Sequence, residues 1–185
     1  AKRLMEQVIE TSVAHGIMTK PEAEARAVSL FRQLSLPSPE TIGERYPHQV
    51  SGGQLQRVMT AMALCPKPDL VIFDEPTTAL DVTTQIDVLV AIKTAIHDTG
   101  VAALYITHDL AVVAQVADDI LVLRGGKKVE YGTTDQIINT PQQAYTQALV
   151  SVRSIDHVEK PDAAAVLSVA NVTARYKGTK FDVLK

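Results

Sequence analysis

The sequence has few cysteines, no long apolar run and little net charge, and each of these absences excludes a class of protein. Its 185 residues contain a single cysteine, Cys65, so no internal disulfide can form, and the apolar neighbours of this residue indicate a buried thiol in a cytosolic protein. No apolar run of roughly 18 residues occurs, which excludes a membrane-spanning helix. The net charge of −3 argues against a nucleic-acid binder that depends on neutralising phosphates.

Metal-ligand spacings and a secretion signal are missing as well. The histidines other than His108 are scattered and form no metal-ligand spacing with Cys65, so we expect no transition-metal site. The first residues, Ala1 to Glu6, resemble an amphipathic helix already under way rather than a signal peptide, and we interpret this start as a cut. The apolar fraction of 46% and mean hydropathy of +0.07 are typical of a soluble globular protein with one domain, or one domain plus a fragment.

Helical periodicity dominates residues 1–65. Thr19 and Glu22 have the spacing of a capping box that opens a second helix, and Pro37 and Pro39 end it before a polar loop. Apolar side chains recur every three or four residues, at Leu4, Val8, Ile9, Ala27, Leu30, Phe31 and Leu34. This part of the chain is therefore predicted to be a helical subdomain.

Strand and helix patterns alternate in residues 66–153. The continuous apolar run 70–74 predicts a strand buried on both faces, and a second such strand follows at 101–107. Helices are predicted for 82–96, capped by Asp81, for 110–116, and on both sides of Pro141, with a hairpin around the Gly125-Gly126 pair. The order predicts an α/β fold with a parallel sheet and an antiparallel edge. Residues 154–165 have linker composition, and 166–176 alternate like the start of a new strand.

The segment Ser51, Gly52, Gly53 and Gln54 precedes a helix whose apolar face is Leu55, Val58, Met62 and Cys65. One interpretation is structural, because Ser51 and Gln54 have capping-box spacing. The other is functional: two glycines let backbone N–H groups approach a phosphate, which the positive end of the helix dipole favours. One geometry serves both interpretations.

Acidic residues and a histidine follow the two predicted strands. Asp74 closes the first strand at a carboxyl end, where a carboxylate can hold Mg²⁺ through its water shell, and Glu75 beside it could orient or deprotonate a water. His108 follows the second strand and could hydrogen-bond a terminal phosphate. Taken alone, these residues also fit structural roles. Asp74 and Glu75 could be a solvated acidic pair before Pro76, and His108 could be a histidine at a helix start.

The order of these motifs resembles the signature motif, Walker B segment, D-loop and switch histidine of an ATP-binding-cassette (ABC) ATPase. Residues 46–57, 69–76, 77–81 and 105–110 carry them in family order, and the resemblance covers about residues 1–132. Val50 departs mildly from the leucine common before Ser-Gly-Gly-Gln. The sequences Tyr-Pro-His-Gln at 46–49, Thr-Thr-Ala-Leu-Asp at 77–81 and the tail at 140–149 resemble the oligopeptide, dipeptide and nickel importer branch.

The resemblance implies a partial P-loop NTPase cassette. No G-x-x-x-x-G-K-[ST] phosphate loop (Walker A) occurs in the sequence. Residues 1–65 resemble the helical subdomain, 66–153 the C-terminal part of the ATPase core with its tail helices, and 166–185 the start of a second cassette after the 154–165 linker. We therefore expect a parent protein with two cassettes in tandem and an isolated chain that is inactive.

The family's head-to-tail dimer implies a role for each candidate residue. Ser51, Gly52, Gly53 and Gln54 would cap an ATP bound by the other cassette, and Tyr176 would stack on the adenine of that nucleotide. Asp74, with Mg²⁺ held through water, would serve the other ATP together with catalytic Glu75 and His108, while Asp81 lies in the D-loop that contacts nucleotide. This chain would then hold pieces of two sites.

The resemblance implies an energy-coupling subunit of an importer for peptide-like or other small solutes. Its partners would be a second cassette, on the same chain or in a homodimer, transmembrane permease subunits and, indirectly, a solute-binding protein, but no nucleic acid. It would be cytoplasmic and peripheral on the inner face of the membrane. One alternative is a soluble, non-transport ABC ATPase that acts on ribosomes or DNA, although the basic or coiled insertions typical of that class are not visible. Another is a fragment that serves only as an interaction module.

Overall fold

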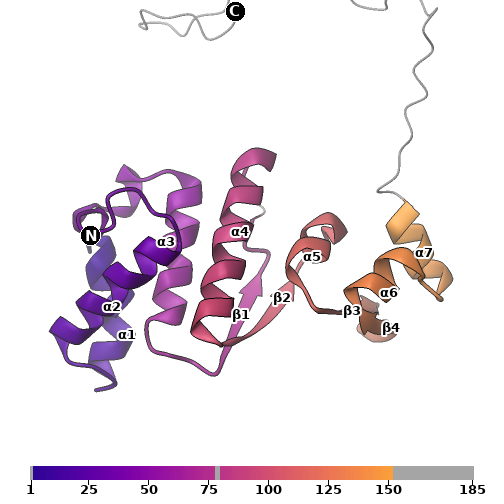
Figure 1. Ribbon diagram of the computed structural model, residues 1–185, viewed down its shortest axis with the longest axis horizontal. Helices are drawn as coiled ribbons and strands as arrows, with labels where there is room; N and C mark the ends of the chain where they lie inside the picture. The colour runs from indigo at the N-terminus through magenta and orange to yellow at the C-terminus, as the bar shows by residue number, and fades with distance from the viewer. Residues whose placement is uncertain (1, 78–79, 152–185) are drawn as a thin grey trace, which may run out of the picture. The chain divides into compact units, whose positions relative to one another are not determined.

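The computed structural model describes residues 2–77 and 80–151, with the backbone alone at 82, 83 and 111. Its helices are α1 (Leu4–Ala14), α2 (Lys20–Gln33), α3 (Gly52–Leu64), α4 (Val82–Thr99), α5 (Leu110–Val116), α6 (Thr134–Asn139) and α7 (Ala144–Ser151), with single 3-10 turns η1 (Ile42–Glu44) and η2 (Pro47–Gln49). Its strands are β1 (Leu70–Asp74), β2 (Ala102–Ile106), β3 (Asp119–Arg124) and β4 (Lys127–Thr133) (Figure 1). No helix in this part of the chain has the length and apolar character needed to cross a bilayer. The predicted linker and second-cassette start lie outside the described residues.

Helices α1, α2 and α3 pack around one apolar core, as the periodicity predicts. All the predicted apolar positions of α1 and α2 are buried, with Leu30 and Phe31 fully inaccessible. The predicted capping box is present, because the backbone N–H of Thr19 donates to the Glu22 carboxylate at 2.8 Å. Burial of each large side chain stabilises the fold by roughly 1.5–3 kcal/mol.

The C-terminal end of α3 is held by an arginine from α2. The Arg26 guanidinium donates to the carbonyl oxygens of Leu64 at 2.9 Å and Cys65 at 2.8 Å. Cys65 is buried, as predicted. Met62, by contrast, is exposed rather than part of the buried face, because the stripe that α3 buries runs through Val58, Ala61 and Leu64.

Strands β1 and β2 form a parallel pair, in register from Leu70 opposite Ala102 to Asp74 opposite Ile106. Val71 and Phe73 point into the same core as Val88, Ile92 and Ala95 of α4. On the other face Leu70, Ile72, Leu104 and Ile106 are 46–58% exposed. The prediction that both strands are buried on both faces is therefore wrong for the described residues. Side chains alternate between the two faces of a strand, and the described elements cover only one of these faces.

Strands β3 and β4 form the predicted antiparallel hairpin, with Gly125 and Gly126 both at positive φ in the turn. Among the described residues this pair is a separate two-stranded sheet and not an edge of the β1–β2 sheet, which corrects that part of the prediction. Its buried side chains, Ile120 and Val122, pack against Ile137 of α6 instead. The helices on either side of Pro141 are confirmed as α6 and α7.

Candidate functional site

The N-terminus of α3 is closed by a reciprocal capping box. The Gln54 backbone N–H donates to Ser51 Oγ at 3.3 Å, and the Ser51 backbone N–H donates to Gln54 Oε1 at 3.1 Å. The structural interpretation of this motif is therefore confirmed. The N–H groups of Gly52 and Gly53 lie in the first helical turn, where helix geometry supplies no backbone acceptor, so a phosphate could still bind there.

The two glycines of this segment have different surroundings. Gly52 is exposed, and a Cβ built on it would lie 3.3 Å from Leu80 Cδ2. Gly53 is buried, and a Cβ built on it would lie only 2.5 Å from Thr84 Cγ2 and 3.5 Å from Val88 Cγ2 of α4. Glycine at position 53 is thus required for the close approach of α3 to α4. The sequence interpretation, which assigned both glycines to phosphate approach, missed this packing role.

Asp74 and Glu75 lie at the carboxyl end of the parallel pair, as predicted. The Asp74 side chain is exposed, and Glu75 leaves the strand with a φ of +47°, in the left-handed region. For a residue other than glycine this conformation costs on the order of 1–3 kcal/mol, so the surroundings must hold it. One restraint is the backbone, because the Glu75 N–H donates to the Ile106 carbonyl at 2.9 Å.

The second restraint is a hydrogen-bonded pair between Glu75 and His108. Glu75 Oε1 lies 2.7 Å from His108 Nδ1 and accepts from the His108 backbone N–H at 3.1 Å. The Thr107 hydroxyl donates to the other carboxylate oxygen at 3.4 Å. The structure therefore brings the two residues proposed as catalytic together, from the ends of neighbouring parallel strands.

The pair is open to solvent and changes the acidity of the imidazole. The side chain of His108 is 79% exposed and that of Glu75 37% exposed. The hydrogen bond that the His108 imidazole donates to the Glu75 carboxylate, followed by the negative charges of Glu75 and Asp109, raises the pKa of His108 above its ordinary value of 6.5. A protonated imidazole at this edge would attract an anion such as a phosphate, while a carboxylate has lone pairs enough to orient a water as well.

Asp81 caps α4, as the sequence predicts. Its Oδ1 accepts from the Thr84 backbone N–H at 3.0 Å, and its carbonyl accepts from Gln85 N at 2.8 Å. Gln85 in turn donates from Nε2 to the hydroxyl of buried Thr77 at 3.1 Å. Nothing in the sequence pattern indicates this contact. Tyr176, the remaining candidate, lies outside the described residues.

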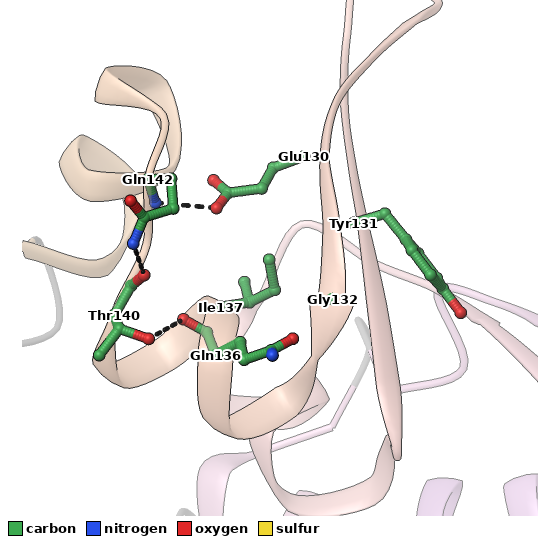
Figure 2. Close-up of a pocket in the computed structure, with 7 residues that line it drawn as sticks. All are labelled: Glu130, Tyr131, Gly132, Gln136, Ile137, Thr140 and Gln142. Carbon is green, nitrogen blue, oxygen red and sulfur yellow. Dashed lines mark hydrogen bonds between the residues drawn. The ribbon is translucent and has the colours of Figure 1, made fainter.

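A cavity of about 280 Å³ lies away from these residues, between β4 and the turn from α6 to α7 (Figure 2). Its polar groups are used internally: the Glu130 carboxylate accepts from the backbone N–H groups of Gln142 at 2.8 Å and Gln143 at 3.2 Å. The Thr140 hydroxyl donates to the Gln136 carbonyl, and Tyr131 extends away from the rest. The Glu130 hydrogen bonds therefore hold the segment just before α7 in place, and we assign no catalytic role to this cavity.

Comparisons with known proteins agree with the motif order. Residues 2–78 match the family described as ABC transporter. Over 146 residues the chain is 46% identical to the glutathione import ATP-binding protein GsiA of Escherichia coli K12, which covers 79% of this chain. The proteins of that name from Escherichia coli O1:K1 and Shigella flexneri serotype 5b are 45% identical over the same length. The chain spans only 23% of the length of these relatives.

Proposed function

Because this chain contains part of an ATP-binding cassette of the ABC transporter family, we propose that its parent protein is the ATP-hydrolysing, energy-coupling subunit of an importer. The observation that carries the proposal is the Glu75–His108 pair at the carboxyl ends of β1 and β2. The relatives are named for glutathione import, which supports a peptide-like or other small solute as cargo. No observation favours the soluble, non-transport alternative.

The residues present fit Mg-ATP. The exposed Asp74 carboxylate would hold Mg²⁺ through water, the first-turn N–H groups at Gly52 and Gly53 would bind phosphate oxygens, and Glu75 would orient a water. His108 would hydrogen-bond the terminal phosphate. Bound Mg-ATP supplies the phosphoryl group and the cation that offsets its charge, so the protein contributes mainly positioning and electrostatics.

The two parts of the site would serve different nucleotides. The Ser51–Gln54 segment, together with Tyr176, would cap the ATP of a second cassette, while Asp74, Glu75 and His108 would serve the first. The domain divisions at 65 and 153, the linker and the second-cassette start belong to the same proposal. So do the permease partners and a location at the inner face of the membrane, reached through the permease.

This split arrangement predicts how the 185-residue chain behaves with nucleotide. Calorimetric titration with Mg-ATP should show no saturable binding, because the sequence has no Walker A loop to hold the phosphates. Clear binding at one ATP per chain or per pair of chains would refute the assignment of the affinity to that loop.

The catalytic role is tested in the parent protein, purified with its membrane partners. Glu75→Gln should slow ATP hydrolysis by roughly 100-fold or more and leave ATP binding intact, because the amide cannot accept a proton from water. Glu10→Gln is the matched control, since Glu10 is an exposed carboxylate of α1 paired with Lys2. Near-normal turnover of Glu75→Gln would contradict the assignment, as would equal losses in both variants.

A further inference from the structure

The first turn of α4 contacts both parts of the candidate site. Asp81 caps this turn through the Thr84 N–H, which fixes the helix start at the end of the loop that follows Glu75. Successive helical residues point about 100° apart, so Thr84 and Gln85 can contact different neighbours from the same turn. In the structure these two neighbours are α3 and the loop after β1.

On one side, Thr84 meets the N-terminus of α3. A Cβ on Gly53 would lie 2.5 Å from Thr84 Cγ2, so an L side chain at position 53 requires α3 and α4 to separate or Thr84 to change its rotamer. Threonine is branched at Cβ and populates mainly two χ1 rotamers in a helix, so its methyl group can leave this position only by a full change of rotamer. The Thr84 side chain therefore limits how closely the start of α3, with the Ser51–Gln54 segment, can approach α4.

On the other side, Gln85 holds the start of the loop after β1. Its Nε2 donates at 3.1 Å to the hydroxyl of Thr77, which is 6% exposed and lies two residues after Glu75. The Thr77 carbonyl accepts from the Leu80 backbone N–H at 3.0 Å, and Pro76 between Thr77 and Glu75 is buried. Gln85 thus anchors the segment whose first residue, Glu75, needs support for its left-handed backbone.

We propose that the first turn of α4 couples the Ser51–Gln54 segment to the Glu75–His108 pair, with Thr84 and Gln85 as its positioning residues. If the two segments serve different nucleotides, which rests on the proposed function, this turn is a route by which the cap on one ATP adjusts hydrolysis of the other.

The coupling is tested by changing Gly53 and observing the Glu75–His108 pair. In the 185-residue chain, Gly53→Ala should push α3 and α4 apart, and the pKa of His108, followed by NMR, should move toward 6.5 as its contact with Glu75 loosens. Thr84→Ser removes the methyl group that clashes, so the Gly53→Ala/Thr84→Ser double variant should recover the wild-type titration. An unchanged pKa in Gly53→Ala, or no recovery in the double variant, would overturn the proposal.

A second set of three variants tests the Gln85 side. Thr77→Val and Gln85→Leu each remove the hydrogen bond and should lower the pKa of His108, whereas Thr77→Ser keeps the hydroxyl and should titrate like the wild type. A wild-type titration in Thr77→Val, or a lowered pKa in Thr77→Ser, counts against the proposal. This set tests the proposal even if Gly53→Ala does not fold. Because the readout is a pKa, these results are independent of Glu75→Gln turnover, which tests the proposed function.

Discussion

Arg26 is the side chain whose removal should most clearly weaken the helical part of the chain without changing its apolar core. Its guanidinium donates to the last carbonyls of α3, those of Leu64 and Cys65, at 2.9 and 2.8 Å. The carbonyls at this end have no partner within the helix, although that of Leu64 also accepts from the Lys67 backbone N–H at 3.1 Å. A cation at this end also interacts favourably with the helix dipole. The side chain is half-buried, so water replaces its contacts poorly.

The loss can be estimated from these contacts. A hydrogen bond from a charged donor contributes about 1.5–3 kcal/mol. Because Arg26 is only half-buried, we take the low end of this range for each of its two bonds, so Arg26→Met should lower the free energy of unfolding by roughly 2–4 kcal/mol. Arg26→Lys keeps the charge but not the planar fork, and should lose about half as much. Urea unfolding of the 185-residue chain, followed by circular dichroism, measures both values.

Arg32 of the same helix provides the matched control. Its ion pair with Glu40 is on the surface, with the two side chains 58% and 59% exposed, so Arg32→Met should cost less than about 1 kcal/mol. If Arg26→Met and Arg32→Met are equally stable within roughly 0.5 kcal/mol, the anchoring role of Arg26 is refuted. A large loss in both variants would point to the helix itself and not to the contact with α3.

Two further predictions concern the sheets and their ends. Because Glu75 raises the pKa of His108, the pair stabilises the fold fully below about pH 6.5 and loses this contribution as the pH rises through the raised pKa. Glu75→Gln should remove this pH dependence from the urea midpoints. Identical pH profiles for the wild type and the variant would contradict the prediction. The exposed apolar side chains of Ile72 and Leu104, 58% and 50% exposed and paired in register, should drive the chain into dimers or larger species. Ile72→Ser/Leu104→Ser should shift size-exclusion profiles toward monomer, whereas a sharp wild-type monomer at high concentration would rule this out.

Local chemistry explains why much of the fold was predictable. The capping pair Thr19 and Glu22 and the cap residue Asp81 specify helix starts through contacts within a few residues, and each is confirmed. The hairpin follows from Gly125-Gly126, since consecutive positive φ angles favour glycine. These features need no knowledge of distant parts of the chain.

Burial of the strands depends on distant parts, and there the sequence misleads. The run Leu70–Asp74 has apolar side chains on both faces, which is suited to a strand covered on both sides, yet the described elements cover only the face of Val71 and Phe73. An apolar run indicates which faces of a strand can be buried, but it does not indicate which helices or strands cover them. The same limit applies to β3 and β4, whose separation from the first sheet no local pattern shows.

Gly53 shows the limit most clearly at the candidate site. A glycine next to a helix start has two sufficient explanations, close approach of a phosphate or close approach of another helix. The sequence alone does not distinguish between them. The 2.5 Å from its hypothetical Cβ to Thr84 Cγ2 establishes the second, which leaves its backbone N–H and exposed Gly52 to serve the first. The methyl group that decides between them is 31 positions along the chain, on a helix that the sequence predicts but cannot place against α3. Site residues can thus be found by motif, whereas the residues that hold them in position emerge only from packing.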